Sequence, residues 1–147
     1  MSDCCSSACQ APVLRQRPGC PRCGRESRAV SAVTLLNQLQ RPWAQGLGDG
    51  PWYFCAGPDC DLVYFNAAGE GFDQARLRQP VGHKQHSEQR LLCYCFGVTL
   101  ADYLADPGVR DFVLAQTKAG VCACASRNPS GRCCLADFPK PALPRER

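Results

Sequence analysis

The chain has 147 residues, of which 13 are cysteines, and a formal net charge of +4 at pH 7. That length suits one ordinary domain or two small modules, and small modules with thin cores are usually held together by disulfides or metal ions. The mild charge, the scattered basic residues and the absence of nucleic-acid-binding motifs argue against a nucleic-acid partner, and no apolar run is long enough to insert into a membrane.

The N-terminal stretch MSDCCSSACQAP has neither the basic nor the apolar region of a secretory signal. We therefore expect a cytoplasmic protein, in which thiols stay reduced and cysteine patterns indicate metal sites more often than disulfides. Residues 1–17 are predicted to be a mobile tail. Its thiols, Cys4, Cys5 and Cys9, either bind a soft ion such as Cu(I) or have no role.

Residues 18–82 are predicted to form a small β-rich module. WYFC and LVYF are rich in aromatic and β-branched residues and read as strands, joined by the turn AGPDCD. TLLNQL favours a short helix with Thr34 as its N-cap. LRQPVGHK favours a final edge strand, because Pro80 cannot occupy a central one.

Two cysteine pairs fall in this module. GCPRCG is a C-x2-C knuckle, and CAGPDC supplies a second pair at the end of one strand and before the next. Four thiolates satisfy tetrahedral zinc and leave no open position for catalysis, so the pattern predicts a structural zinc-ribbon site rather than free or buried thiols. The predicted zinc ligands are Cys20, Cys23, Cys55 and Cys60.

Residues 83–136 are predicted to be helical after a polar connector, HKQHSEQR. Thr99 is a good N-cap with Asp102 in the first turn, and Pro107 suits the first position of a second helix. That helix would end at Gly120. Its apolar stripe would comprise Val109, Phe112, Val113 and Gln116. Residues 137–147 form a Pro-rich tail.

A second cysteine set lies in this helical segment. CYCFGVT places Cys93 and Cys95 directly before a helix, and four more thiols follow the predicted helical pair: Cys122, Cys124, Cys133 and Cys134. A [2Fe–2S] cluster needs four thiolates, two on each iron, and the C-x-C pair could share one of the irons. The spacing alone permits several choices among the last four cysteines.

The motifs GCPRCG, YFCAGPDCDLVYF, VGHK, CYCFGVT and NPSGRCCL occur in an order that resembles the N-terminal domain of CopZ-type copper chaperones. That domain pairs a zinc-binding ribbon with a module similar to bacterioferritin-associated ferredoxin. The resemblance implies zinc at the four cysteines named above and a [2Fe–2S] cluster on Cys93, Cys95, Cys124 and Cys134. The expected fold class is α+β, with a β-rich zinc-ribbon-like module packed closely against a helical cluster-binding module.

The resemblance also implies a function in copper homeostasis. We expect a redox protein that transfers single electrons and reduces Cu(II) to Cu(I), which would amount to a metal-ion reductase activity if it turns over. The alternatives are a module that binds and transfers Cu(I) or Hg(II), a ferredoxin-like electron-transfer partner of another protein such as a copper transporter, and an all-zinc structural protein. Proteins of this family continue into a heavy-metal-binding βαββαβ domain that is not seen here. The resemblance therefore implies only the functions of the zinc-binding and redox modules.

Four residues stay without an assigned function. Cys122 and Cys133 are either small buried residues or alternate ligands for a soft metal. His83 and His86 lie three residues apart in the connector and are either surface histidines or metal ligands. No nucleophilic catalytic arrangement and no phosphate-binding glycine loop stands out, so no catalytic residue is assigned.

Overall fold

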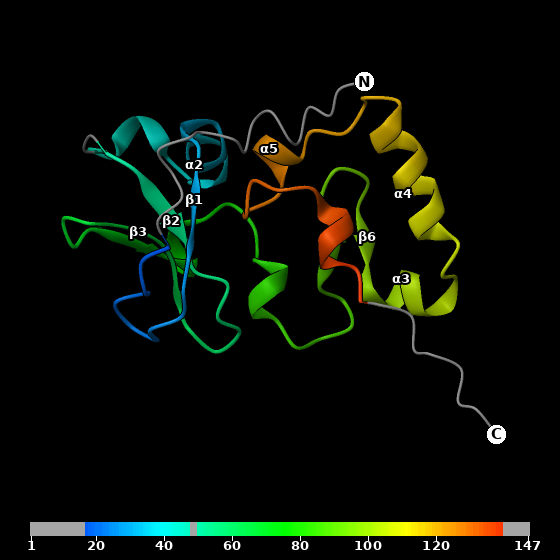
Figure 1. The fold of residues 1–147 in the computed structure, drawn as a ribbon, viewed down its shortest axis with the longest axis horizontal. Helices are drawn as coiled ribbons and strands as arrows, with labels where there is room; N and C mark the ends of the chain where they lie inside the picture. The colour runs from blue at the N-terminus through cyan, green and yellow to red at the C-terminus, as the bar shows by residue number, and fades with distance from the viewer. Residues whose placement is uncertain (1–16, 48–49, 140–147) are drawn as a thin grey trace.

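The structure is a computed structural model, and it describes residues 17–47 and 50–139. It is a mixed α/β fold in which a β-rich N-terminal module lies beside a more helical C-terminal part, residues 82–139 (Figure 1). The described residues contain no helix that is long and apolar enough to cross a membrane.

The β-rich module is built on one antiparallel sheet in the order β1-β2-β3-β4. Its strands are β1 (Arg28–Val30), β2 (Trp52–Phe54), β3 (Leu62–Asn66) and β4 (Gly71–Asp73). The two predicted strands are confirmed as β2 and β3, which pair directly. Every residue of both strands is buried, because apolar side chains cover both faces of the sheet.

One face of the sheet carries the main core. Trp52 and Phe54 of β2 pack there with Leu35 and Leu39 from the helix α2 (Ala32–Gln38) and its C-cap. The opposite face carries Tyr53 with Cys55, which follows the strand, and Cys20 from the preceding turn. The register of β3 shifts between Leu62 and Tyr64, which breaks the strict alternation of the two faces.

Two expectations for this module are wrong. The N-cap of α2 is Ser31, whose hydroxyl accepts from the Thr34 amide, so the helix begins earlier than predicted. The segment LRQPVGHK contains no strand beyond an isolated bridge at Leu77, and its end forms the 3₁₀ turn η3 (Gly82–Lys84). The two edge strands of the sheet are β1 and β4, and the 3₁₀ turn η2 (Gln74–Arg76) follows β4. A further 3₁₀ turn, η1 (Pro42–Ala44), follows α2.

The C-terminal part begins with a short hairpin, β5 (Leu91–Cys93) and β6 (Val98–Thr99). Helices α3 (Leu100–Ala105), α4 (Val109–Lys118) and α5 (Cys124–Arg127) follow, and the 3₁₀ turn η4 (Cys134–Asp137) comes last. Their buried side chains form a separate apolar cluster that includes Leu92, Tyr103 and Phe138.

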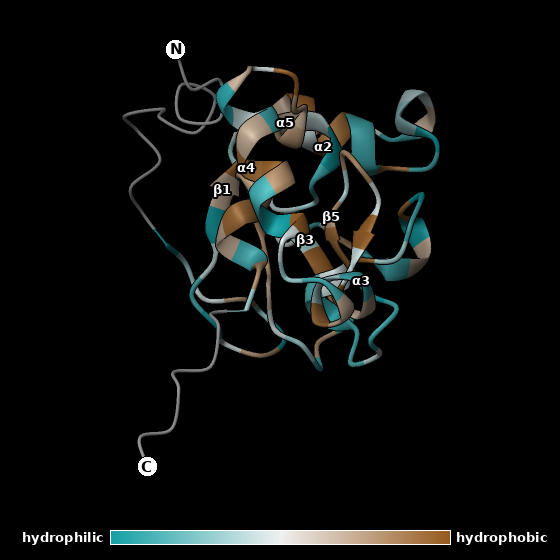
Figure 2. Ribbon diagram, turned by 90° about the vertical axis from the view of Figure 1, so that its right-hand side faces the viewer, coloured by the Kyte–Doolittle hydropathy of each residue, from teal (hydrophilic) through white to brown (hydrophobic). Residues whose placement is uncertain are grey.

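The predicted helix signals of this part are largely confirmed. Thr99 and Asp102 form a reciprocal capping box on α3, and Gly120 adopts a φ of +76° just after α4. The second helix begins at Val109 rather than at the proline. Val113 is fully buried but Phe112 is 50% exposed, so the buried stripe is narrower than predicted. Figure 2 shows both hydrophobic and hydrophilic residues on the outward side of α4.

Candidate metal centres

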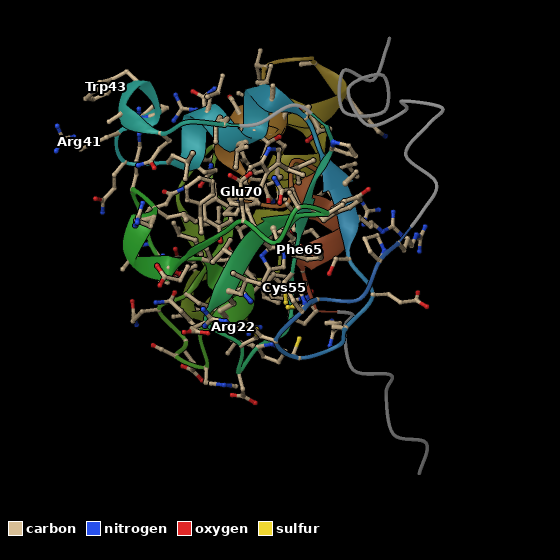
Figure 3. All side chains as sticks on the ribbon, turned by 90° about the vertical axis from the view of Figure 1, so that its left-hand side faces the viewer. Arg22, Arg41, Trp43, Cys55, Phe65 and Glu70 are labelled. Carbon is tan, nitrogen blue, oxygen red and sulfur yellow. The ribbon has the colours of Figure 1, made fainter. Side chains whose placement is uncertain are left out.

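The first cysteine quartet is Cys20, Cys23, Cys55 and Cys60. Cys20 and Cys23 lie in a tight turn that the Gly24 amide closes by donating to the Cys20 carbonyl at 2.8 Å. Cys55 follows β2 directly, and Cys60 lies just before β3. The sheet therefore brings together two loops that are more than thirty residues apart. In Figure 3, Cys55 lies at the end of the sheet beside Arg22, with sulfur atoms gathered near it.

The sulfur geometry of the first quartet matches one tetrahedral ion. All four sulfur atoms lie within 4.8 Å of one another. The Cys20 and Cys60 Sγ atoms are 3.8 Å apart, and those of Cys23 and Cys55 are 3.6 Å apart. A zinc ion with Zn–S bonds of about 2.3 Å would place neighbouring sulfurs about 3.8 Å apart. The residues present thus fit zinc without rearrangement.

Gly57 gives the loop room to approach the sulfurs. A Cβ at this position would lie 3.1 Å from the Cys23 Sγ and 3.5 Å from the Cys55 Sγ. The Gly57 amide also donates to the Cys55 Sγ at 3.4 Å, and the Arg22 amide donates to the Cys20 Sγ at 3.4 Å. Backbone donors aimed at sulfur stabilise thiolates, which are the form that binds a metal.

Burial and hydrogen bonds act in opposite directions on these thiols. Burial raises the pKa of Cys20, but the Cys23 and Arg22 backbone donors outweigh it and bring that pKa down to about 7. Burial raises the pKa of the Cys55 thiol to about 12, although the Gly57 amide and the positive charge of Lys84 partly oppose the rise. A metal ion would have to displace the Cys55 proton.

The Lys84 ammonium group contacts the first quartet and its turn. Its Nζ donates to the Gly57 carbonyl at 2.9 Å, to the Cys60 carbonyl at 3.0 Å and to the Cys55 Sγ at 3.7 Å. The ammonium group thus ties both ends of the CAGPDC turn to η3. Apart from its place in the VGHK motif, no sequence pattern marks Lys84 as a functional residue.

The second cysteine quartet is Cys93, Cys95, Cys124 and Cys134. Cys93 ends β5, and Cys95 lies in the turn that follows. Cys124 and Cys134 are the first residues of α5 and η4. Cys93, Cys124 and Cys134 are at most 2% exposed, and all four thiols belong to or pack against the apolar cluster of the C-terminal part.

The thiols of the second quartet contact one another. The Cys95 and Cys124 Sγ atoms are 3.7 Å apart. A hydrogen bond from the Cys134 thiol, with a smaller one from Cys95, lowers the pKa of Cys93 to about 3. Cys134 also interacts with Cys124, so contacts link all four thiols.

The second quartet is also wider than the first. Among the residues that the structure describes, only the first quartet has three or more ligand atoms all within 4.8 Å of one another. The Ala123 amide donates to the Cys95 Sγ at 3.1 Å, which adds a backbone donor to the second quartet. The four sulfurs of the second quartet thus converge in one cluster but span a wider site than those of the first.

The structure shows no ligand role for the remaining candidates that it describes. Cys122 and Cys133 are partly buried, whereas Cys4, Cys5 and Cys9 lie outside the described residues. The Nε2 atom of His83 is 3.1 Å from Asp137, and that of His86 is 2.9 Å from Asp59. The two imidazoles contact different carboxylates and do not converge on one ion.

Three comparisons place the chain among known proteins. A family model described as a zinc binding domain, zf_CopZ, matches residues 17–78. The copper chaperone CopZ of Archaeoglobus fulgidus is 34% identical over an alignment of 119 residues. The alignment covers 78% of this chain and 57% of that protein. The chain therefore spans a little over half the length of this curated relative.

A solved structure extends the similarity beyond the zinc-binding segment. The X-ray structure of the Archaeoglobus fulgidus CopZ N-terminal domain matches with a TM-score of 0.63 and 32% identity, over 83% of this chain and 99% of that domain. The match therefore covers nearly the whole solved domain, in sequence as well as in fold. The chain belongs to the family of the CopZ N-terminal domain.

Proposed function

We propose that this protein is a zinc- and [2Fe–2S]-containing redox protein of copper homeostasis, which acts in the cytoplasm. In this proposal residues 18–82 form the zinc module, with Cys20, Cys23, Cys55 and Cys60 as ligands. Residues 83–136 form the cluster module, with Cys93, Cys95, Cys124 and Cys134 as ligands. The segments 1–17 and 137–147 flank the two modules.

The observation that carries the proposal is the second quartet. Four thiols from β5, its turn, α5 and η4 converge in one apolar cluster, and their sulfurs span a wider site than those of the first quartet. A cluster of two irons takes two thiolates on each iron, and the Cys95 and Cys124 sulfurs, 3.7 Å apart, could share one of them. When bound, a [2Fe–2S] cluster supplies the exchange of single electrons.

The protein's own groups would tune that centre. The Ala123 amide, which donates to the Cys95 Sγ at 3.1 Å, favours the thiolate form. The apolar cluster that surrounds Cys93, Cys124 and Cys134 limits contact with water. Cu(II) would be the substrate, because its conversion to Cu(I) takes up one electron for each ion.

Metal analysis of anaerobically purified protein tests this proposal. We expect about two irons, two sulfides and one zinc per chain, given two thiolates per iron and four per zinc, and an EPR signal after one-electron reduction. Cys124→Ser should lose iron and keep zinc, whereas the neighbouring thiol variant Cys133→Ser should keep both. A colourless protein with two zinc ions and no iron would overturn the redox proposal in favour of an all-zinc structural protein.

The second candidate function is the binding and transfer of a soft metal such as Cu(I). The exposure of Cys23 favours it, because this thiol lines an open hollow of about 470 Å³ together with Arg22 and Arg25. An exposed ligand can be exchanged by an incoming thiol of a partner protein. Tight Cu(I) binding that displaces zinc from the first quartet in the wild type, with no such binding in Cys23→Ser, would favour this function.

A further inference from the structure

The helix α5 carries Cys124 but is too short to be stable by itself. It has four residues, Cys124–Arg127, and therefore only one turn. A single helical turn is unfavourable in isolation, and the last carbonyl groups of a helix have no partner within it. The carbonyls of Ala125, Ser126 and Arg127 therefore need donors from elsewhere in the protein.

Two side chains of α2 supply those donors. The Thr34 hydroxyl donates to the Ala125 carbonyl at 2.5 Å. The Gln38 amide donates to the Ser126 carbonyl at 3.0 Å and to the Arg127 carbonyl at 2.9 Å. Figures 1 and 2 both show α2 and α5 side by side, although nearly ninety residues separate them in the sequence.

The contact between α2 and α5 is buried. Thr34 is 1% exposed and Gln38 is 2% exposed. A buried amide or hydroxyl is costly unless it is hydrogen-bonded, so these side chains cannot easily turn to another partner. The β-rich module therefore holds the backbone of α5 at a fixed position.

The same module also holds the turn that leads to Cys134. The Tyr64 hydroxyl, which is fully buried, donates to the Pro129 carbonyl at 2.5 Å. Gly131 packs against Thr34 so closely that a Cβ at position 131 would lie 2.6 Å from the Thr34 Oγ1. Two thiols of the second quartet are thus attached to a segment that the β-rich module fixes at several points.

We propose that Gln38 and Thr34 are positioning residues for the second cysteine quartet, so that the β-rich module sets the geometry of a centre built from the C-terminal part. Their role as residues that tune a cluster rests on the proposed function, because it requires Cys124 to be a cluster ligand. Their role in fixing α5 does not require a bound cluster.

The test compares Gln38→Leu with Gln40→Leu in the full-length protein. Gln40 is the control, because its side-chain amide also donates to a distant carbonyl, that of Leu77 at 2.9 Å. Gln40 and Leu77 both lie within the β-rich module, so this hydrogen bond does not reach α5. Leucine keeps the approximate volume of glutamine and removes the donor. Thr34→Val, which removes only a hydroxyl, is the second variant in case Gln38→Leu folds poorly.

Amide hydrogen exchange is the first measurement. The Arg127 and Asn128 amides donate to carbonyls at the start of α5 and therefore report whether the turn is formed. Loss of a buried donor should speed their exchange by about tenfold or more in Gln38→Leu, with a smaller effect in Thr34→Val and none in Gln40→Leu. Exchange within twofold of the wild type in both test variants would overturn the inference.

The second measurement separates positioning of the quartet from general stability. In protein that holds the cluster, Gln38→Leu should shift the reduction potential, change the visible circular dichroism and shorten the cluster lifetime in the presence of a chelator, while zinc content stays at the wild-type level. Unchanged spectra and lifetime would overturn the positioning role. Absence of iron from the wild type would instead overturn the proposed function, and the exchange comparison would still decide whether α2 fixes α5.

Discussion

Replacement of Lys84 by methionine tests how the first quartet is stabilised. Methionine keeps much of the aliphatic stem and removes the ammonium group that contacts the Gly57 carbonyl, the Cys60 carbonyl and the Cys55 Sγ. Four thiolates around one divalent zinc ion carry two excess negative charges. The Lys84 charge offsets part of that excess, so we expect zinc binding to weaken.

The magnitude follows from the distances. At 3.7 Å from the Cys55 Sγ, the gross attraction between unit charges is about 4 kcal/mol at an effective dielectric constant of about 20. The hydration that the ammonium group gives up on partial burial cancels much of it. A net loss of about 1–3 kcal/mol, as for hydrogen bonds to charged groups, corresponds to zinc binding weakened by roughly 5- to 150-fold.

Competition with a chromogenic chelator at fixed pH measures this change. Arg22→Met is the matched control, because the Arg22 guanidinium pairs with Asp61 at an exposed site, where such pairs contribute little, so its loss should weaken zinc binding less than the loss of Lys84. The release of zinc on acidification should also begin at higher pH in Lys84→Met, because loss of the positive charge raises the pKa of Cys55 further and a proton then competes better with zinc. Equal zinc affinity in Lys84→Met and the wild type would refute the reasoning.

Three further predictions concern single residues. Cys23→Ser should lose zinc and retain any iron, as measured by metal analysis, and simultaneous loss of both metals would argue against two separate centres. Thr99→Ala removes half of a capping box and should lower the free energy of unfolding, measured in urea, by about 1 kcal/mol. A change below roughly 0.3 kcal/mol, which is within the scatter of surface substitutions, would contradict this. Val113 is fully buried, so Val113→Ala should lower the free energy of unfolding by about 2 kcal/mol. It should also lower the melting temperature more than Phe112→Ala does, because the Phe112 side chain is half-exposed. The reverse order would refute the assigned packing.

The sequence predicted elements well where one local signal decided the outcome. Strands β2 and β3 were identifiable because short aromatic and β-branched runs are bounded by a turn. The capping box at Thr99 and the glycine stop after α4 are local motifs that do not depend on the rest of the fold. The first quartet could also be predicted from the sequence, because strand pairing brings together two closely spaced cysteine pairs that lie near strand ends.

The features that were missed depend on contacts between distant segments. Gln38 lies at the end of a helix and carries no sequence signal, but it is buried because α5 lies against it. Lys84 binds the turn at Gly57 across 27 residues. The convergence of the second quartet follows from the placement of α5 and η4 beside β5, which the C-x-C motif alone could not reveal.

The segment LRQPVGHK failed as a strand for a related reason. Pro80 removes one donor, and the Gln74 side chain takes the place of a strand partner by accepting from the Val81 amide at 2.9 Å. The chain then turns at Gly82, whose amide donates to the Tyr94 hydroxyl at 2.5 Å. The apolar residues of this segment, Leu77 and Val81, pack into the core of the β-rich module rather than forming a sheet edge.

The close packing of Gly131 against Thr34 has a consequence for how such sequences can diverge. Any side chain at position 131 meets the Thr34 hydroxyl at 2.6 Å and must also adopt a φ of +73°, which is unfavourable for residues other than glycine. A larger residue at position 131 therefore requires a smaller one at position 34, and that change removes the donor to the Ala125 carbonyl. Although positions 34 and 131 are 97 residues apart in the sequence, we expect substitutions at them to occur together among homologues.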